Sequence, residues 1–471
     1  MLSIKDHYDV IVVGSGPTGC ACANRCGQLG LKTLCVDNIS SDLTDNVTQG
    51  VVCHPGCLET FTLLESANFY SELLKKSKYH GLKFKSLTYD LNRMMKRKSG
   101  ILKTIAQHTV KQFSDYDIDF IHGTSKLLGS GKIEIYSLNS KRIISASHIV
   151  LATESIPIPV PGAPIDNRYI IDSTIALNIN TTPKQLGILG AGVLGLELAS
   201  IWNRLGADTI LFDAQESFLN LVDHQISREA YKIFTEQGID IRLGTRVLST
   251  NIINNKVVIE YQDIEEGAQK IEVDMLFVAS GRKPNSENIA APEANLFIDS
   301  NGFVLTDENY RTNLPNVYAI GDLALAGPML THKGVSEGNF VADKIGNREI
   351  ANINYKLIPN VIYTMPEIAW IGQTESSLNA LGYPTNVEIY SFDQNIKAIS
   401  VDQTDGIIKI VSCAKSDTVL GIQLIRNNAS ELISYAAIAM EFSATSEDIK
   451  RTMYPYLSFT DILSTVPRKL Q

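Results

Sequence analysis

Residues 8–37 begin with YDVIVV and GSGPTG, continue with a stretch of helical period, and end with KTLCVD. The first run is short, apolar and rich in β-branched residues, which indicates a buried strand. Gly14, Gly16 and Gly19 follow as a GxGxxG turn, and Asp37 lies 23 residues after Gly14, at the end of a second strand. This order predicts a βαβ unit of the dinucleotide-binding type.

The glycines of this turn have separate physical roles. The first permits a tight turn, the second lets backbone N–H groups reach a pyrophosphate, and the third lets helix and strand pack closely. The N-terminus of the helix that follows offers unpaired N–H groups and the positive end of the helix dipole to phosphate. A carboxylate at the tip of the second strand, here Asp37, can accept hydrogen bonds from a ribose.

The same order returns at residues 186–213, where LGIL leads into GAGVLG and TILFD ends the unit. Gly190 and Asp213 are again 23 residues apart. Two copies of one unit predict two dinucleotide sites, as a two-cofactor oxidoreductase needs. Asp213 favours a free ribose 2′-hydroxyl, and no arginine occurs between Asp213 and Ser227 to hold a 2′-phosphate. NAD(H) is therefore favoured over NADP(H).

The composition is that of a globular protein. The chain has 471 residues, 44% hydrophobic and 20% charged, which allows roughly two to four domains. Acidic residues outnumber basic ones by 51 to 42, and the net charge of -9 disfavours nucleic acid as a partner. No apolar run approaches the roughly 20 residues that span a bilayer, and a strand pattern begins by Tyr8. We expect a cytoplasmic protein with no membrane segment or signal peptide.

Seven cysteines suit a compartment in which thiols stay reduced. Five lie in apolar predicted elements and are expected to be buried core residues: Cys20, Cys22, Cys26, Cys35 and Cys413. The other two, Cys53 and Cys57, lie close together on either side of His54, Pro55 and Gly56.

The rest of the chain divides into further segments. Residues 73–112 have a polar helical pattern, and their basic run at 93–98 is expected to be a solvated helix face. Residues 149–153 indicate a strand before a Pro-rich connection, 156–164, which suits a hinge. Beyond residue 352 the pattern predicts a separate α+β domain of about 120 residues.

Several segments together resemble the flavin-dependent pyridine nucleotide-disulfide oxidoreductases, and within that family the dihydrolipoamide dehydrogenases. The segments are the two glycine motifs, GRKPN at 281–285, NVYAIGD at 316–322, GPMLTHK at 327–333 and IYTMPEIAW at 362–370. They span almost the whole chain.

The resemblance implies that the first unit binds FAD, with Asp322 holding the ribityl chain, and that the second binds NAD(H). It places Glu197 beside nicotinamide and flavin. The implied FAD residues are Gly14, Gly16, Pro17, Thr18, Gly19, Asp37, Thr153, Gly321, Asp322, Met329, Leu330 and Thr331. The implied NAD residues are Gly190, Gly192, Val193, Leu194, Gly195, Asp213, Val247 and Gly281.

The chain departs from the family at its redox centre. The family uses a CxxxxC disulfide, a Lys four residues beyond it, and a His-Pro motif with a following Glu that the partner subunit supplies as general base. Here Cys53 and Cys57 form CxxxC, Phe61 replaces the Lys, and Tyr454 and Phe459 replace the His and the Glu.

These departures bear on the rate of the dithiol reaction. A general base contributes roughly 10² to 10⁴ in rate, and all eight histidines lie at or before His332. Dihydrolipoamide turnover is therefore expected to be slow. A further departure is Glu154, which follows Thr153 where the family usually has Gly.

The state of the cysteine pair stays open between two reduced thiols and a redox-active disulfide. A regular helical i, i+4 spacing holds Cβ atoms about 5–6 Å apart, wider than the roughly 3.5–4.5 Å that a disulfide tolerates. A bridge would need the Pro55-Gly56 turn to bend the chain. His54 is the nearby imidazole, but side chains of neighbouring residues diverge. Cys-His-Cys lacks a fourth ligand, so no metal site is predicted.

The sequence thus predicts an α/β protein with two Rossmann-like domains, for FAD and NAD, and a C-terminal α+β dimerisation domain. The expected bounds are 1–155 and 285–351 for the FAD-binding and central parts, 156–284 for the NAD-binding domain and 352–471 for the interface domain. The expected activity is that of an NADH-linked oxidoreductase of the dihydrolipoamide dehydrogenase type, with Cys53, Cys57, Glu197 and Tyr454 as candidate catalytic residues.

The expected assembly is a homodimer that serves a 2-oxoacid dehydrogenase complex or a lipoyl protein. Two alternatives for the function stay open. One is a transhydrogenase-like or diaphorase-like flavoprotein without dithiol chemistry, and the other is a non-catalytic subunit that holds FAD.

Overall fold

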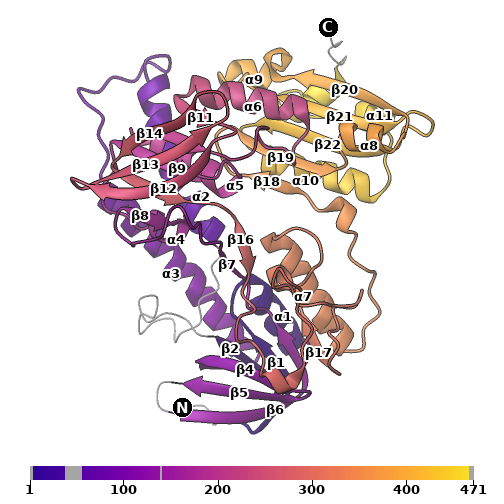
Figure 1. The fold of residues 1–471 in the computed structure, drawn as a ribbon. Coiled ribbons are helices and arrows are strands. Elements are labelled where there is room, and N and C mark those ends of the chain that lie inside the picture. Colours follow the sequence, from indigo (N-terminus) through magenta and orange to yellow (C-terminus); the bar gives the residue numbers. More distant parts are fainter. Residues whose placement is uncertain (1–3, 38–55, 138–139, 466–471) are drawn as a thin grey trace. The chain divides into compact units, whose positions relative to one another are not determined.

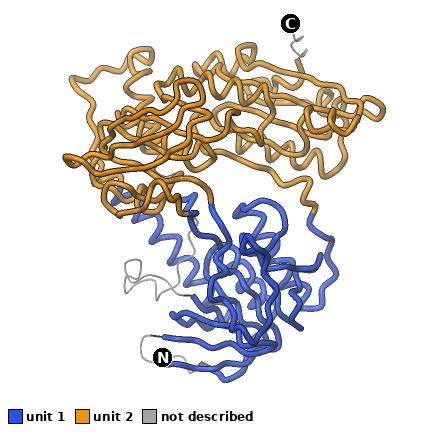
Figure 2. The backbone as a smooth tube through the Cα atoms, viewed as in Figure 1, with its two compact units in different colours: residues 1–59, 95–158, 282–353 blue, residues 60–94, 159–281, 354–471 orange. Residues whose placement is uncertain are grey.

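The chain forms two compact units, drawn in different colours in Figure 2. The computed structural model describes residues 4–37, 56–137 and 140–465. The first unit joins residues 1–59, 95–158 and 282–353, and the second joins 60–94, 159–281 and 354–471. One boundary, after Ile158, lies in the Pro-rich connection that the sequence suggested as a hinge.

The first unit is built on a seven-stranded sheet (Figure 1). Strands β3-β2-β1-β6 are parallel, β17 adds to β6 in parallel, and β5 and β4 continue antiparallel. The strands are β1 (His7–Val13), β2 (Thr33–Asp37), β3 (Asp119–His122), β4 (Thr124–Gly129), β5 (Lys132–Ser137), β6 (Ser140–Leu151) and β17 (Val317–Ala319). In this parallel arrangement β1 lies between β2 and β6, so its glycine turn opens at the centre of the sheet edge.

Two helices of this unit pack closely against each other, α1 (Pro17–Gln28) and α7 (Thr331–Ile345). Their close approach depends on glycine, since a Cβ on Gly338 would lie 2.7 Å from the carbonyl oxygen of Thr18. The core beneath the sheet consists of aliphatic side chains from its strands, including Ile11, Leu34 and Ile149.

The second unit contains a five-stranded parallel sheet in the order β11-β10-β9-β15-β8. Its strands and helices are β8 (Ile170–Asp172), α4 (Ser173–Ala176), β9 (Gln185–Leu189), α5 (Val193–Arg204), β10 (Asp208–Phe212), α6 (His224–Glu236), β11 (Ile239–Arg242) and β15 (Met275–Val278). A three-stranded antiparallel sheet accompanies it, formed by β12 (Arg246–Ile253), β13 (Lys256–Asp263) and β14 (Gly267–Val273).

The C-terminal part of the second unit is an antiparallel sheet of five strands in the order β18-β19-β22-β21-β20. Its elements are β18 (Asn360–Ile362), β19 (Glu367–Gly372), α8 (Glu375–Ala380), β20 (Thr385–Ser391), α9 (Ile396–Ser400), β21 (Ile407–Cys413), β22 (Val419–Arg426), α10 (Ala429–Glu441) and α11 (Ser446–Arg451). Helix α10 contacts β19 and β22. This is the α+β architecture that the sequence predicted beyond residue 352.

The expected buried cysteines are confirmed, because Cys20, Cys22, Cys26, Cys35 and Cys413 are all buried. Among the described residues, no helix combines the length and apolar character that crossing a bilayer requires.

The helical pattern predicted over residues 73–112 corresponds to parts of two helices with a turn between them. Helix α2 (Gly56–Lys76) ends well before α3 (Leu91–Asp115) begins. Gly81 adopts a φ of +71°, and the N–H of Leu82 donates to the carbonyl oxygen of Ser77 at 2.9 Å. A left-handed glycine turn of this kind stops helix continuation.

The interpretation of the basic run 93–98 as a solvated face needs a correction at its last residue. Lys98 is buried, and its ammonium group lies 2.9 Å from Glu59 Oε2. The helical period turns Lys98 toward α2, where a carboxylate partner compensates the burial of its charge.

A buried ion pair ties α6 to the C-terminal sheet within the second unit. Lys409 on β21 lies 2.8 Å from Asp223, the N-cap residue of α6, and 2.6 Å from Glu375 on α8. The Lys409 and Asp223 side chains are only 2% and 3% exposed. A charge buried to this degree is stable only while its partner is present.

Lys409→Ala is therefore expected to lower the free energy of unfolding by about 3–5 kcal/mol, because it leaves the Asp223 carboxylate buried without its counter-ion. Thermal and denaturant unfolding would measure the loss. Lys270→Ala is the matched control, since Lys270 pairs with Glu260 at the surface with exposed fractions of 60% and 42%, and should change stability by no more than about 0.5 kcal/mol. Equal effects of the two substitutions would contradict this account.

Candidate functional site

The turn after β1 has a backbone that only glycine fits. Gly14 adopts a φ of +109°, and a Cβ there would lie 2.0 Å from the carbonyl oxygen of Ala152. A Cβ on Gly19 would lie 1.9 Å from the carbonyl oxygen of Gly14. Gly16 is the N-cap of α1 and has an extended backbone. It leaves the first N–H groups of α1 without a cap from its own side chain, the arrangement that binds anions at a helix N-terminus.

Asp37 closes this turn from the end of β2. Its Oδ2 accepts hydrogen bonds from the backbone N–H of Ser15 at 2.6 Å and from the Ser15 hydroxyl at 2.8 Å. Sequence reasoning assigned the acid to a ribose but missed the serine, whose position inside the GxGxxG motif was the available signal. Asp37 thus also holds the turn in its shape.

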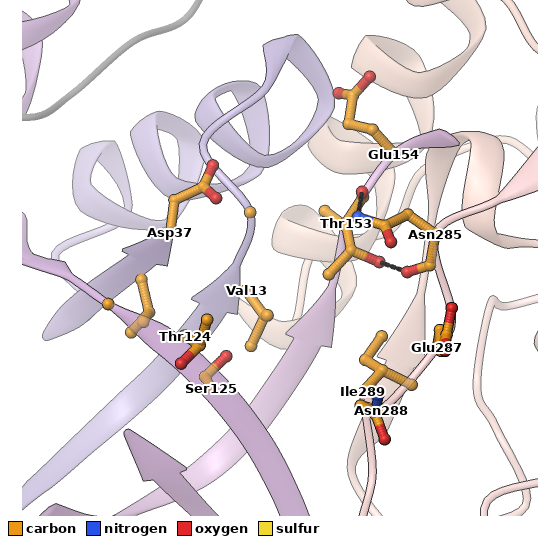
Figure 3. A pocket seen from close by; sticks show the side chains of 14 residues that line it. Val13, Asp37, Thr124, Ser125, Thr153, Glu154, Asn285, Glu287, Asn288 and Ile289 are labelled. Carbon is orange, nitrogen blue, oxygen red and sulfur yellow. Dashed lines mark hydrogen bonds between the residues drawn. The ribbon is translucent and has the colours of Figure 1, made fainter. Parts of the chain in front are cut away.

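A cavity of about 320 Å³ lies beside this turn, and all of its lining residues belong to the first unit. It lies at the ends of β1, β2 and β6, where ligands bind in open parallel sheets. Its lining is shown in Figure 3 and consists of Val13, Gly14, Val36, Asp37, Gly123, Thr124, Ser125, Ala152, Thr153, Glu154, Asn285, Glu287, Asn288 and Ile289. Of the predicted FAD residues, Gly14, Asp37 and Thr153 thus line one cavity.

Hydrogen bonds fix the strand end that carries Thr153. The Thr153 hydroxyl donates to the carbonyl oxygen of Asn285 at 2.7 Å, and the Asn285 amide donates back to the carbonyl oxygen of Thr153 at 3.2 Å. The Asn285 N–H also donates to the carbonyl oxygen of Glu154 at 2.9 Å. Asn285 is the last residue of the GRKPN segment, so that segment anchors this wall of the cavity.

Asp322 lies in a neighbouring network of the same unit. Its Oδ2 accepts a hydrogen bond from Ser155 at 2.5 Å, and the Arg282 guanidinium donates to the same Ser155 hydroxyl at 2.7 Å. Strands β7 (Ser155–Pro157) and β16 (Arg282–Pro284) pair antiparallel and carry Ser155 and Arg282, whereas Asp322 lies in the short 3-10 helix Gly321–Leu323.

A buried ion pair supports the Gly321 backbone next to Asp322. The Lys333 ammonium group donates to the carbonyl oxygen of Gly321 at 2.9 Å and lies 3.2 Å from Glu337. Glu337 in turn accepts a hydrogen bond from the Gly321 N–H at 2.7 Å. The predicted residues Met329 and Leu330 are partly buried just before α7, and Thr331 is its first, exposed residue.

The second glycine turn repeats the geometry of the first. Gly190 adopts a φ of +108°, and a Cβ on Gly195 would lie 1.8 Å from the carbonyl oxygen of Gly190. Asp213 Oδ2 accepts the N–H of Ala191 at 2.7 Å, as Asp37 accepts that of Ser15. Gly192 faces open space. Apart from its chain neighbours and its own helix, none of the described residues comes within 4 Å of the point that a Cβ on Gly192 would occupy.

The other predicted NAD residues are less uniform in their exposure. Val193 is exposed at the start of α5, Leu194 is partly buried, and Gly281 is exposed with a φ of +114°. Val247, on β12, is buried in a hydrophobic cluster that contains side chains of both the parallel and the three-stranded sheet.

Glu197 on α5 is deeply buried, and one oxygen accepts the backbone N–H of Tyr363 at 3.0 Å. Burial raises the pKa of Glu197 to about 7, although the Tyr363 hydrogen bond opposes the rise. Phe61, which replaces the family's Lys, packs edge-on against the Tyr363 ring with centroids 5.6 Å apart. An aromatic contact thus occupies the position for which the resemblance implies a Lys.

The thiol candidates are only partly described. Cys57 lies in the first turn of α2, exposed, with its Sγ 3.9 Å from the Thr331 hydroxyl. Cys53 lies outside the described residues, and so do His54 and Pro55.

The Tyr454 side chain is engaged within its own chain. Its hydroxyl donates to the carbonyl oxygen of Ile449 at 2.9 Å, and burial raises its pKa above the ordinary value. Phe459 stacks on the Arg426 guanidinium at 3.4 Å from the ring centroid. A protonated phenol and a phenyl ring offer no proton acceptor at neutral pH.

Comparisons with known proteins agree with this architecture. The profile of the family described as Pyridine nucleotide-disulphide oxidoreductase matches residues 8–338, and that of its dimerisation domain matches residues 358–467. The chain is 36% identical to a dihydrolipoyl dehydrogenase of Cupriavidus necator, covering 98% of this chain and 97% of the relative. It is 35% identical to dihydrolipoyl dehydrogenase 3 of Pseudomonas aeruginosa, with the same coverage of 98% and 97%.

Among solved structures, the fold is similar to that of the HOCl-induced flavoprotein disulfide reductase RclA from Escherichia coli in its Cu(II) complex. The TM-score is 0.85 at 22% identity, and the match covers 98% of each chain.

The buried Glu197 carboxyl group should make stability depend on pH. Its pKa is about 7 in the folded chain and about 4.3 when unfolded. Its stabilising contribution is therefore complete below about pH 4.3 and is lost as the pH rises through 7, by an amount on the order of 3 kcal/mol. Glu197→Gln should remove this decrease in the free energy of unfolding between about pH 4.3 and pH 7.

Glu236→Gln on α6 is the matched control, because Glu236 is exposed in the same unit. Unfolding midpoints from pH 5 to pH 8 would be compared for the three proteins. A Glu197→Gln profile parallel to that of the unchanged protein would refute the assignment of this pH dependence to Glu197.

Proposed function

Because the chain belongs to the pyridine nucleotide-disulphide oxidoreductase family, in the branch that resembles dihydrolipoyl dehydrogenases, we propose that it transfers electrons between NAD(H) and bound FAD. This family uses FAD and NAD(H). The observation that carries the proposal is the pair of equivalent glycine turns, each held by a carboxylate from the next strand, at Ser15 in one unit and at Ala191 in the other.

The residues present fit the two cofactors to different degrees. At the second turn, Gly192 faces open space and Asp213 is poised for a ribose, so an NAD(H) molecule has room. At the first turn, Gly14 and Gly19 give the close strand–helix approach that FAD binding requires, and the cavity adjoins it. The Glu154 carboxyl group lies in front of Gly16, so a pyrophosphate fits there only when that side chain moves.

When bound, FAD would accept a hydride from NADH and pass the two electrons onward. For FAD, we propose the residues predicted from the sequence, with Asp37 and Thr153 at the cavity wall and Asp322 held by Ser155. For NAD(H), we propose the second glycine turn and Asp213. Glu197, neutral in part at pH 7, is proposed to shape the space beside the nicotinamide without carrying a full charge.

The dithiol step is proposed to use Cys53 and Cys57, and to be the weak part of the reaction. Phe61 provides no cation to stabilise a thiolate, and the Tyr454 hydroxyl is committed to a backbone carbonyl. A thiol without assistance is only a few per cent ionised at neutral pH. Dithiol exchange is therefore expected to be slower than hydride transfer.

The matched dimerisation domain supports a homodimer. We further propose a lipoyl protein or a 2-oxoacid dehydrogenase complex as the partner and the cytoplasm as the location. The proposed domain bounds stay 1–155, 156–284, 285–351 and 352–471. Of the second unit, residues 159–281 fall within the proposed NAD-binding domain and residues 354–471 within the proposed interface domain.

NADH should bind more tightly than NADPH, by about tenfold or more, because the Asp213 carboxylate would repel a 2′-phosphate. Asp213→Asn should weaken NADH binding and reduce the ratio of the NADH affinity to the NADPH affinity. Titration monitored by nicotinamide fluorescence would measure both affinities. Asp208→Asn, at an exposed position of the same strand, is the control. Tighter binding of NADPH than of NADH would overturn the assignment of Asp213.

With NADH as donor, an artificial acceptor such as a quinone or dye should turn over faster than the reaction of dihydrolipoamide with NAD. We expect a gap on the order of 10² to 10⁴, the contribution of a general base. Stopped-flow and steady-state rates on the same FAD-loaded sample would give both values. Equal or faster dithiol turnover would show that another group serves as the base.

Counting thiols on denatured protein before and after treatment with NADH distinguishes two reduced thiols from a redox-active disulfide at Cys53 and Cys57. Two additional thiols that vanish in a Cys57→Ser variant would support dithiol chemistry at this pair. An unchanged count would eliminate it and leave flavin-based electron transfer alone.

A further inference from the structure

The two glycine turns differ at the second glycine of each motif. In front of Gly192 there is open space, whereas a Cβ on Gly16 would lie 2.1 Å from Glu154 Oε1. The carboxyl carbon of Glu154 would lie 2.6 Å from the same point. The second glycine is where a backbone must approach a pyrophosphate. At the first turn, the Glu154 carboxyl group therefore fills the place that the second turn leaves open.

Glu154 is held in this position by its backbone. It adopts a φ of +63°, a conformation that favours glycine, and its carbonyl oxygen accepts the N–H of Asn285 at 2.9 Å. The bonds between Thr153 and Asn285 fix the preceding residue as well. Figure 3 shows the Glu154 side chain extending away from that pair. A strained residue persists where its surroundings determine its conformation.

The carboxyl group has poor compensation for its charge. Its Oε1 is shut off from solvent and has no hydrogen-bond partner among the described residues. The groups that act on it are the Thr18 N–H on α1, the Asp322 and Asp37 carboxylates, and Arg282 on β16. Burial and then the negative charge of Asp322 raise the pKa of Glu154 to about 7. The Arg282 guanidinium is already bonded to Ser155 at 2.7 Å.

We infer that the Glu154 carboxyl group occupies the position at the N-terminus of α1 that the FAD pyrophosphate would take, and that this side chain must move out into solvent before FAD binds. This inference rests on the proposed function, in which FAD binds at the first turn. A carboxylate at a helix N-terminus uses the same N–H groups and dipole as a phosphate. Whether protonated or not, the Glu154 carboxyl group fills the space in front of Gly16, so it and a pyrophosphate exclude each other there.

The displacement has a defined proton balance. Before FAD binds, Glu154 holds its proton below about pH 7. In solvent its pKa returns to about 4.3, so between these values its departure releases close to one proton. FAD affinity should therefore rise with pH, by up to about tenfold per unit between pH 5 and 6.5, and level off above pH 7.

The test is a titration of apoprotein with FAD, followed by quenching of flavin fluorescence, at pH 5 to 8. Glu154→Gln keeps the size of the side chain but removes the titratable carboxyl proton, so the FAD affinity of this variant should not change with pH. Glu154→Gly clears the space in front of Gly16 and relieves the positive φ, and it should bind FAD at least tenfold more tightly than the unchanged protein at pH 6. Glu293→Gln, at an exposed position of the same unit, should behave like the unchanged protein.

Calorimetric titration in buffers of different ionisation enthalpy would count the protons directly. Release of about one proton at pH 6 in the unchanged protein, and of none in Glu154→Gln, would support the inference. FAD binding without proton release and with equal affinity in all four proteins would overturn it while leaving the proposed function intact. Failure of every variant to bind FAD at any pH would overturn the proposed function instead.

Discussion

The close approach of a helix to the strand before it is the constraint on which the rest of this molecule depends. In both units the third glycine of the turn faces the carbonyl oxygen of the first, and a Cβ on it would lie only 1.9 Å from Gly14 or 1.8 Å from Gly190. Any larger residue would push the helix off the sheet. The same approach directs the first N–H groups of the helix to the sheet edge, where Asp37 and Asp213 clamp each turn through Ser15 and Ala191.

Sequence reasoning predicted what depends on local pattern. The βαβ units, the two acids at equal spacing and the buried cysteines follow from hydrophobic periodicity and from residue types with few alternative roles. Features that depend on tertiary contact were missed. The burial of Lys98 is set by a partner on another helix, and the position of the Glu154 backbone by a hydrogen bond from Asn285. The turn at Gly81 that follows α2 is local, and its glycine was the signal available in the sequence. The partners of Lys98 and Glu154 are remote in sequence, so no local pattern could reveal them.

This chain keeps the glycine turns of the family but differs from it at the positions that the resemblance assigns to proton transfer. The two glycine turns keep the same geometry, each with a carboxylate from the next strand bonded to its backbone. Phe61, at the position where the resemblance implies a Lys, forms an aromatic pair with Tyr363, and Phe459, where it implies a Glu, stacks on the Arg426 guanidinium. The two glycine turns differ in one respect, because the Glu154 carboxyl group lies in front of Gly16 at the first turn, whereas the second turn is open at Gly192 among the described residues.

We propose that one glycine turn binds the electron donor NADH and the other the acceptor FAD. Anaerobic titration of the FAD-loaded protein with NADH, followed in the flavin absorption band, tests it most directly. The account predicts that about one equivalent of NADH bleaches the band and that NADPH does so more slowly. A flavin that binds yet keeps its oxidised spectrum in excess NADH would contradict the account.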